Sequence, residues 1–371
     1  MQRRCLARGF SLIEMMIAMA LGLVVLGASM QLFNQAMNAT WAVSQRAEMQ
    51  QDLRAASNLL TQDLSLAGAG MLNANIALAS GTGTLPVYGT NINGAPVAYP
   101  TQLVSGNTIP FVYGLIPGPN LGPLINGQST DIVTVVYTDS VFLLNCYNAK
   151  VTNNVTATFT LPATPLPGCA SPPLPAPPQA IDNAAVGLTP GDLVWFQVTT
   201  GTGSGAKSAG VLADVTNVVN NGGNQFTVTF ANADALRINQ IAATAGNLAS
   251  VINWTGSGTR LLVTTYYVDT LNGIPRLMRQ VSGHTPVPVA ENITSLKFTY
   301  DVFNNGTTTA RQADGGASLG LTPNQITKIN VEHLSLRSQL RGTKGYQSLD
   351  FQTSVAARDL LFKNDYPVST N

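Results

Sequence analysis

The sequence predicts an α+β fold in which one long N-terminal helix packs on an antiparallel β-sheet, with loop-rich elaborations. No proline occurs before Pro86, so a single helix can run from the N-terminal region far into the chain. Segments rich in β-branched residues recur from residue 131 onward, separated by turns rich in glycine, asparagine and proline. The N-terminal part therefore supplies the helix, and the C-terminal part supplies the sheet.

The predicted helix begins with an apolar segment that is long enough to cross a membrane. Residues 10–30 carry one charge, Glu14, and a helix of this length spans a hydrocarbon core of roughly 30 Å. The preceding residues 1–9 hold three arginines and no acid. This pattern is typical of a secretory signal peptide. The apolar run is longer than a signal peptide requires, however, and no Ala-x-Ala site follows it closely, so we expect the segment to be retained.

An ordinary signal anchor is the second interpretation of the same segment. It leaves Glu14 unexplained, because a carboxylate inside the bilayer costs a few kcal/mol unless it is paired. A specific partner for Glu14 is therefore expected.

Residues 31–67 are expected to continue the helix as its amphipathic half. Apolar positions recur there at intervals of three and four residues, which places them on one face of the helix. These positions are Met49, Leu53, Ala56, Leu60, Leu64 and Ala67. Gly68 to Gly70 are expected to end the helix, since glycine is favoured just beyond a helix terminus.

The remainder, residues 68–371, is expected to form one β-rich globular domain. Residues 71–130 are expected to be mostly extended loop with one or two short strands. Later segments alternate or are rich in β-branched residues, and predict strands at 131–137, 193–198, 211–219, 225–230, 261–269, 276–281, 296–302 and 326–336. The strands 261–269 and 276–281 predict a hairpin turning at Asn272-Gly273, with a connection longer than two residues.

Residues 146–180 are expected to form a surface excursion rich in cysteine and proline. Eight of the 21 prolines lie between Pro162 and Pro178, and such a run cannot join a central sheet because proline lacks the backbone N–H. A proline-rich ligand for another domain is the functional alternative.

Catalytic chemistry has little support in the sequence. Only His284 and His333 could serve as near-neutral acid–base groups or histidine metal ligands. Either could lie beside an acid, but a satisfied structural histidine is the favoured interpretation of both. The sequence contains no nucleophile elbow, phosphate-binding loop or Cys-x-x-Cys pair. We therefore expect no enzyme activity and no cofactor.

A calcium site is the one metal site weighed against a structural turn. Oxygen ligands are available from Asp301, Asn304, Asn305 and Asp314, but their spacing fits no EF-hand. A turn held by local hydrogen bonds is favoured. Charged residues make up 10% of the chain, and no basic patch suggests direct nucleic-acid binding.

The N-terminal residues carry a specific family resemblance. The segment from Arg8 to Ala18, Arg-Gly-Phe-Ser-Leu-Ile-Glu-Met-Met-Ile-Ala, resembles the class III signal of type IV pilins and type II secretion pseudopilins. The resemblance implies a pilin-like fold, cleavage after Gly9 by a prepilin peptidase, and N-methylation of the new N-terminal Phe10. Residues 10–30 would then be retained, and Glu14 would pair with the terminal amine of a neighbouring subunit during assembly.

The C-terminal half resembles the PilW type of minor pilin. The resemblance covers residues 261–302, including Tyr266-Tyr267-Val268-Asp269, and residues 353–358. It implies a protein that primes assembly of a type IV pilus and sits near its tip. The alternative is a J-class pseudopilin of a type II secretion system, from which this chain departs in its long loop-rich middle region. An anchored periplasmic binding or enzymatic domain is a third hypothesis.

Partners and location follow from the same resemblance. The partners would be prepilin peptidase, other minor pilins, the major pilin, the inner-membrane assembly machinery, a tip adhesin, and membrane lipid before assembly. The protein would cross the inner membrane once, with its C-terminal domain in the periplasm, and then enter the extracellular pilus. Motility and adhesion would be traits of the whole pilus.

Two cysteines remain once the leader, which contains Cys5, is removed. Cys146 and Cys169 would face the periplasm, where disulfides persist, and we expect them to be joined. Two buried free thiols are the alternative. The loop they would close corresponds to stabilisation on the order of 3 kcal/mol.

Overall fold

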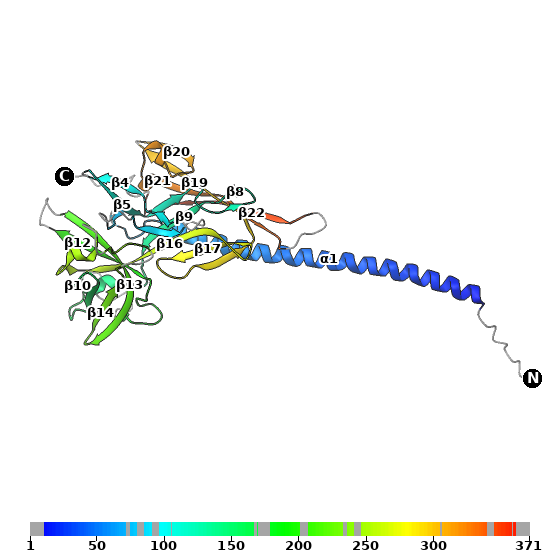
Figure 1. Ribbon diagram of the computed structural model, residues 1–371, viewed down its shortest axis with the longest axis horizontal. Coiled ribbons are helices and arrows are strands. Elements are labelled where there is room, and N and C mark those ends of the chain that lie inside the picture. Colours follow the sequence, from blue (N-terminus) through cyan, green and yellow to red (C-terminus); the bar gives the residue numbers. More distant parts are fainter. Residues whose placement is uncertain are drawn as a thin grey trace, which may run out of the picture.

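The computed structural model shows one long helix that projects from a β-rich body, with the first turn of the helix farthest from the body (Figure 1). The structure describes residues 11–71, 75–79, 85–90, 96–104, 106–166, 169, 179–200, 207–232, 236–240, 246–304, 306–339, 345–357 and 359–360. The predicted combination of an N-terminal helix and antiparallel sheets is confirmed.

Helix α1 runs from Leu12 to Ser65, 54 residues without a break. At 1.5 Å per residue it is about 81 Å long. The apolar stripe predicted from its periodicity faces the β-rich body, because Met49, Ala56, Leu60, Leu64 and Ala67 are buried and Leu53 packs partly buried beside them. Met49 is the first buried residue of the helix, and most of the part that precedes it extends beyond the body.

The helix ends where the glycines predict. Residues 66–70 form a turn in which Gly68 and Gly70 have φ of +78° and +72°, the left-handed region that glycine adopts without strain. The Gly68 N–H donates to the Val136 carbonyl at 2.9 Å, which joins the turn to the sheet. A Cβ on Gly114 would lie 2.6 Å from the Gly68 Cα, so these two glycines permit a close backbone approach.

The largest sheet has eleven strands, and its central path runs β15-β10-β11-β14-β13-β12-β16-β17-β18, with β9 pairing to both β16 and β6. Its strands are β6 (Leu115–Gly118), β9 (Ile132–Thr138), β10 (Asn148–Val151), β11 (Thr156–Thr160), β12 (Leu193–Thr200), β13 (Lys207–Gly222), β14 (Gln225–Phe230), β15 (Thr255–Gly256), β16 (Gly258–Leu271), β17 (Ile274–Val281) and β18 (Val287–Glu291).

A second sheet, in the order β20-β19-β21-β22, comes from the C-terminal part of the chain. Its strands are β19 (Ile293–Asn304), β20 (Thr307–Gln312), β21 (Ile326–Arg337) and β22 (Ser348–Ala356). The N-terminal end of the body adds the sheet β1-β5-β4 and the pairs β2-β3 and β7-β8. These strands are β1 (Asn75–Ala77), β2 (Val87–Thr90), β3 (Pro96–Ala98), β4 (Thr101–Val104), β5 (Asn107–Tyr113), β7 (Leu124–Ile125) and β8 (Gln128–Ser129).

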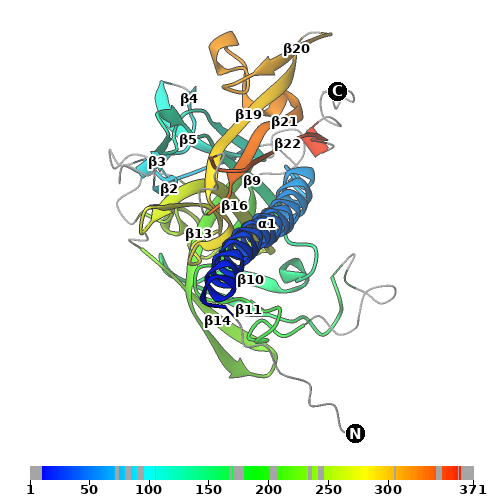
Figure 2. The same ribbon diagram turned by 90° about the vertical axis from the view of Figure 1, so that its right-hand side faces the viewer.

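The end of α1 contacts both of the large sheets. Its neighbours are β18, at one end of the eleven-stranded sheet, and β21 and β22 of the second sheet (Figure 2). Leu60 and Leu64 share one core with residues from both sheets, including Val135, Tyr266 and Phe298. The helix therefore holds the two sheets together as well as projecting from them.

Three expectations about the β-rich body were wrong. The described residues between 71 and 130 form eight strands, most of them short, instead of one or two. Most of them are two to four residues long, too short to show a periodic pattern, and they exist because neighbouring strands complete their hydrogen bonds.

The 146–180 segment is likewise more regular than the surface excursion that was expected. Strands β10 and β11 form a hairpin within the large sheet, and their alternate residues Ala149, Val151, Ala157 and Phe159 are buried. The proline content of the following stretch hid this alternation. Residues 167–168 and 170–178, which carry most of the proline run, lie outside the described residues.

The β16–β17 hairpin is tighter than expected. Leu271 pairs with Ile274, so Asn272-Gly273 forms a turn of two residues. Their φ values are +54° and +77°, which suit a type I′ turn and explain why asparagine and glycine stand there.

We predict that the buried stripe of α1 carries much of the stability of the helix–sheet core. Leu60→Ala should lower the free energy of unfolding by about 2–5 kcal/mol, because Leu60 is fully buried. Leu59→Ala, at a neighbouring position that is 39% exposed, should cost about 0.5 kcal/mol or less. Denaturant unfolding of the full chain in detergent measures both, and equal losses would contradict this packing.

Candidate functional site

The free end of α1 holds the residues that the N-terminal motif singles out. Ser11 is the N-cap, and its Oγ accepts from the Glu14 N–H at 3.3 Å, while the Glu14 Oε2 accepts from the Ser11 N–H at 3.0 Å. This capping box satisfies two of the orphan donors of the helix N-terminus. Gly9 and Phe10 lie outside the described residues. Glu14 lies in the first turn of α1, and this end of the helix is far from the β-rich body (Figure 1).

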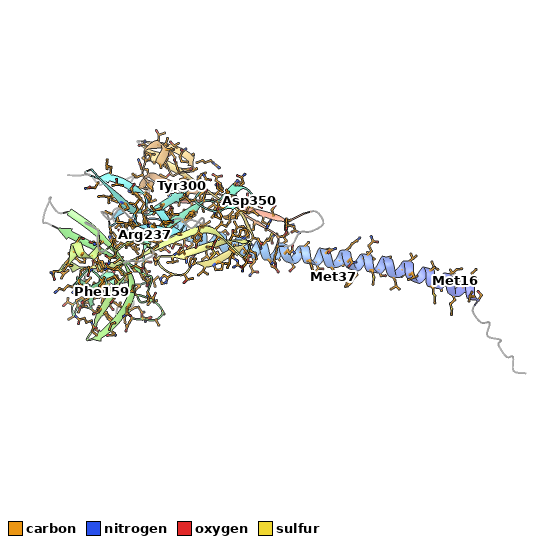
Figure 3. The ribbon with its side chains drawn as sticks, in the orientation of Figure 1. Met16, Met37, Phe159, Arg237, Tyr300 and Asp350 are labelled. Carbon is orange, nitrogen blue, oxygen red and sulfur yellow. A yellow bond between two sulfur atoms is a disulfide. The ribbon has the colours of Figure 1, made fainter. Side chains whose placement is uncertain are left out.

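The segment that follows Glu14 presents apolar side chains on every side. Leu12 to Met30 contain no buried residue, and α1 is long and apolar enough to cross a membrane. Met16 and Met37 both lie on the part of the helix that extends beyond the body (Figure 3). The exposed Glu14 carboxylate therefore lies at the N-terminal end of an apolar helix, where it can pair with a positive group on another molecule.

At its other end, α1 is fastened to the sheet by a buried carboxylate. Asp63 is 4% exposed, and its Oδ2 accepts from Arg279 Nε and from the Tyr266 hydroxyl, both at 2.7 Å. The Asp63 Oδ1 accepts from Arg279 Nη2 at 3.3 Å. Asp63 of the helix thereby forms a bidentate ion pair with Arg279 of β17 and accepts a hydrogen bond from Tyr266 of β16.

The protonation states of this cluster reinforce the pairing. Burial and the Asp63 carboxylate raise the pKa of Tyr266 far above its ordinary value of 10.0, so its hydroxyl remains a donor. Burial alone would lower the pKa of Arg279, but the hydrogen bond and the charge of Asp63 outweigh burial and raise it. Arg279 is therefore a permanent cation beside Asp63.

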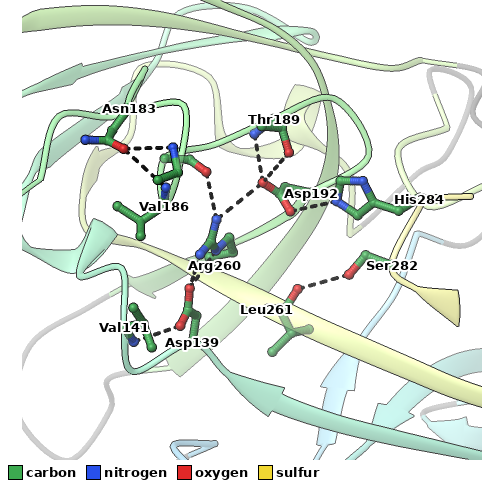
Figure 4. A network of polar contacts seen from close by, with 12 residues as sticks. Asp139, Val141, Asn183, Val186, Thr189, Asp192, Arg260, Leu261, Ser282 and His284 are labelled. Atoms are coloured by element: carbon green, nitrogen blue, oxygen red, sulfur yellow. Dashed lines mark hydrogen bonds and ion pairs between the residues drawn. The ribbon is translucent and has the colours of Figure 1, made fainter. Parts of the chain in front are cut away.

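A second polar network joins loops that are far apart in the sequence (Figure 4). Arg260 of β16 donates from Nε to Asp139 Oδ2 at 2.7 Å and from Nη1 to the Gly187 carbonyl at 2.8 Å. Its Nη1 also lies 3.5 Å from Asp192 Oδ2. The guanidinium carbon stands 5.2 Å from the centre of the Phe142 ring. Arg260 therefore ties the 139–142 loop and the 187–192 turn to the sheet.

His284 completes this network from the turn after β17. Its Nε2 lies 3.0 Å from Asp192 Oδ1. The hydrogen bond to Asp192 raises the pKa of His284 above 6.5, and the charges of Asp192 and Asp214 add to it, although burial and Arg260 act in the opposite direction. Burial would raise the pKa of Asp192, but hydrogen bonds from His284 and the Thr189 N–H, together with Arg260, hold it below 3.8.

His333 and the acids considered as calcium ligands form hydrogen bonds within the fold. His333 Nδ1 lies 3.0 Å from Asp350 Oδ2 on the neighbouring strand, next to the β-bulge between Val331 and Leu334. The Asp301 carboxylate accepts from the Arg311 N–H and from Asn330, and Asp314 accepts from the N–H groups of its own turn. Among the described residues, no group of three or more His, Cys, Asp or Glu side chains is placed to hold a metal ion.

Cys146 and Cys169 are joined by a disulfide, with their Cα atoms 5.6 Å apart. Cys146 ends a short 3₁₀ helix, Leu144–Cys146, that lies between β9 and β10. The disulfide ties residue 169 to this buried part of the body.

Sequence reasoning missed Asp63 and Arg260. A signal for Asp63 was present, because an acid between Leu60 and Leu64 on the buried stripe requires a partner. Arg260 carried no such signal, since its partners Asp139 and Asp192 are 121 and 68 residues away in the sequence.

We predict that the Asp63–Arg279 pair is essential for docking the helix. Asp63→Asn should lower the free energy of unfolding by about 3 kcal/mol or more, because it leaves Arg279 without its charge partner in a largely buried site. Arg311→Gln breaks an ion pair whose arginine is 70% exposed, and should cost about 1 kcal/mol or less. Urea unfolding compares the two, and a similar small loss from both would refute the docking role.

We predict that the His284–Asp192 contact makes stability depend on pH. Because the folded-state pKa of His284 is raised above 6.5, its contribution is fully present below pH 6.5 and is lost as the pH rises through the folded-state pKa. Asp192, with a lowered pKa, contributes above pH 3.8, so the pair is strongest between these values. The unfolding midpoint should fall more between pH 6 and pH 9 in the unsubstituted protein than in His284→Gln. His333→Gln is the control, and an unchanged slope in His284→Gln would disprove the contribution.

One comparison with known proteins finds a match, and it includes the free end of α1. A family model described as the prokaryotic N-terminal methylation motif matches residues 4–30. No curated protein and no solved structure matches the chain. The matched residues include Ser11, Glu14 and the apolar part of α1, and the motif implies processing by a prepilin peptidase and assembly with pilus machinery. Together with the apolar N-terminal helix and the antiparallel sheets, this motif indicates a type IV pilin-like protein.

Proposed function

We propose that this chain is a minor pilin of the PilW type, which primes assembly of a type IV pilus and is incorporated near its tip. The observation that carries the proposal is a prepilin motif on a 54-residue helix whose first buried residue is Met49. Such a helix presents a long surface that only a membrane or other subunits can cover. The role is one of assembly, without enzymatic chemistry or a cofactor.

Processing follows from the motif. Prepilin peptidase would cut between Gly9 and Phe10 and remove the leader 1–9, after which Phe10 would be N-methylated. Residues 10–30 would hold the chain in the inner membrane while residues 68–371 face the periplasm. The disulfide between Cys146 and Cys169 suits that oxidising compartment.

Glu14 would have two roles in succession. In the isolated chain it caps its own helix through Ser11. In the assembled filament it would also meet the terminal amine of a neighbouring subunit, and burying both charges together would fix the axial register of the two helices. Other minor pilins, the major pilin and a tip adhesin are the proposed neighbours. Direct nucleic-acid binding is not proposed.

A J-class pseudopilin of a type II secretion system is the second candidate, because pseudopilins share the prepilin motif. The long middle part of the body favours the pilus. Deleting the gene should abolish piliation if the chain primes a pilus, and should block secretion of exoproteins if it belongs to a pseudopilus.

We predict that charge at residue 14 matters for assembly and that helix capping matters less. Glu14→Gln keeps the capping box, because glutamine also serves at this position, but it removes the charge that would pair with a neighbour's amine. It should be processed normally, yet its amount in purified pili should fall at least about tenfold, the effect of losing 1.4 kcal/mol or more.

Ser11→Ala is the matched control, because it weakens the cap and keeps the carboxylate. Its amount in pili should stay within a few-fold of the unsubstituted chain. Quantitative mass spectrometry of sheared pili measures both variants. Absence of the unsubstituted chain from pili would overturn the proposed function, and normal incorporation of Glu14→Gln would overturn the role of Glu14.

A further inference from the structure

A hollow lies on the outer face of strands β10, β11, β14 and β15, at one end of the eleven-stranded sheet. Alternation along these strands separates two faces of the sheet. Ala149, Phe159 and Phe226 point inward and belong to a hydrophobic core, so the residues between them point outward. The hollow has a volume of about 630 Å³, within the range of small-molecule sites.

The strand register brings the outward side chains together in two neighbouring rows. One row consists of Asn148, Thr160 and Gln225, and the other of Thr255, Lys150 and Thr158. Adjacent strands are about 4.8 Å apart, so side chains in a row are direct neighbours. Hydroxyl, amide and ammonium groups from four strands therefore line one small area.

These hydrogen-bonding groups are not engaged elsewhere in the fold. In the part of the chain that the structure describes, the six side chains of the two rows form no side-chain hydrogen bond or ion pair. Thr152 also lines the hollow, but its hydroxyl is paired with that of Thr156 at 2.7 Å. Lys297 and Arg311 of the C-terminal sheet each have an acid partner, whereas Lys150 has none among the described residues.

The chemistry of the lining selects one class of ligand. Lys150 is the only charged residue among the described residues that line the hollow, so an anionic group complements it. The lining has no large apolar side chain, which the centre of a protein–protein interface would require. A nucleic acid would need several cations along its backbone. Hydroxyl and amide groups both donate and accept hydrogen bonds, as sugar hydroxyls do.

The hollow is also accessible to a large ligand from outside. Phe159, which lies between Thr158 and Thr160 on β11, is at the opposite end of the molecule from Met16 of α1 (Figure 3). Strands β10 and β14 lie at the same end (Figure 1). A chain anchored through α1 therefore holds this end away from the membrane.

We propose that the hollow binds an acidic carbohydrate, with the carboxylate of a uronic acid residue on Lys150. The hydroxyls of the same sugar and of its neighbours would bond to the threonines and amides of the two rows. Such a ligand satisfies both features of the lining, because a neutral sugar leaves Lys150 unpaired and a simple polyanion leaves the hydroxyls and amides unused. The inference goes beyond the proposed function, since binding would not depend on which filament the chain enters.

Calorimetric binding of hexagalacturonate, a chain of uronic acids, tests the proposal. The full chain is purified in a detergent that has no sugar headgroup, so the result is independent of incorporation into pili. Hexagalacturonate should bind at least about tenfold more tightly than neutral maltohexaose, as expected for a charge-assisted hydrogen bond. It should also bind more tightly than polyglutamate of equal charge. Equal affinity for either control ligand, or no binding of hexagalacturonate at millimolar concentration, would overturn the proposal.

Two pairs of variants locate the binding to the hollow. Lys150→Gln should weaken hexagalacturonate binding at least about tenfold, whereas Lys328→Gln, the same change on the C-terminal sheet, should leave it unchanged.

Thr158→Val removes one hydroxyl and should weaken binding about two- to tenfold. Thr229→Val is its control, because Thr229 lies on the same outer face but outside the lining. Unfolding midpoints should be alike in all four variants, which separates lost affinity from lost folding. If Lys150→Gln and Thr158→Val bind as tightly as their controls, the hollow is not the binding site and the proposal fails.

Discussion

The attachment of one helix to two sheets is the constraint on which the rest of this molecule depends. Asp63 is buried on α1 and holds Arg279 and Tyr266 of the large sheet, and the apolar stripe around it enters a core shared with the C-terminal sheet. Because this contact involves only the last part of the helix, most of the preceding part projects beyond the body. The free surface needed for assembly is a consequence of that limited attachment.

Local patterns in the sequence predicted the regular parts of the fold. The periodic apolar residues of α1 and the β-branched runs from residue 131 onward have enough length to be recognised, and both form as expected. Most strands between residues 75 and 129 were not predictable in the same way, because strands of two to four residues show no period and are fixed by their partners. The β10–β11 hairpin was hidden by neighbouring prolines and cysteines, although its own residues alternate.

The candidate functional residues show the same division, between those that local sequence indicates and those that only the folded chain brings together. Glu14 belongs to a continuous motif, so its proposed role could be inferred without coordinates, whereas the Ser11 cap was recognised only in the structure. Asp63 and Arg279 are 216 residues apart, and only the folded chain shows that a helix acid and a strand arginine form one site.

The most direct test of the account is the intact mass and N-terminal sequence of the protein recovered from membranes, with and without prepilin peptidase. The account predicts a mature chain that starts at methylated Phe10 only when the peptidase is present. An intact Met1 in both strains, or cleavage beyond Met30, would contradict it. The long helix would then be an ordinary anchor or a discarded segment, and its exposed surface would need a different explanation.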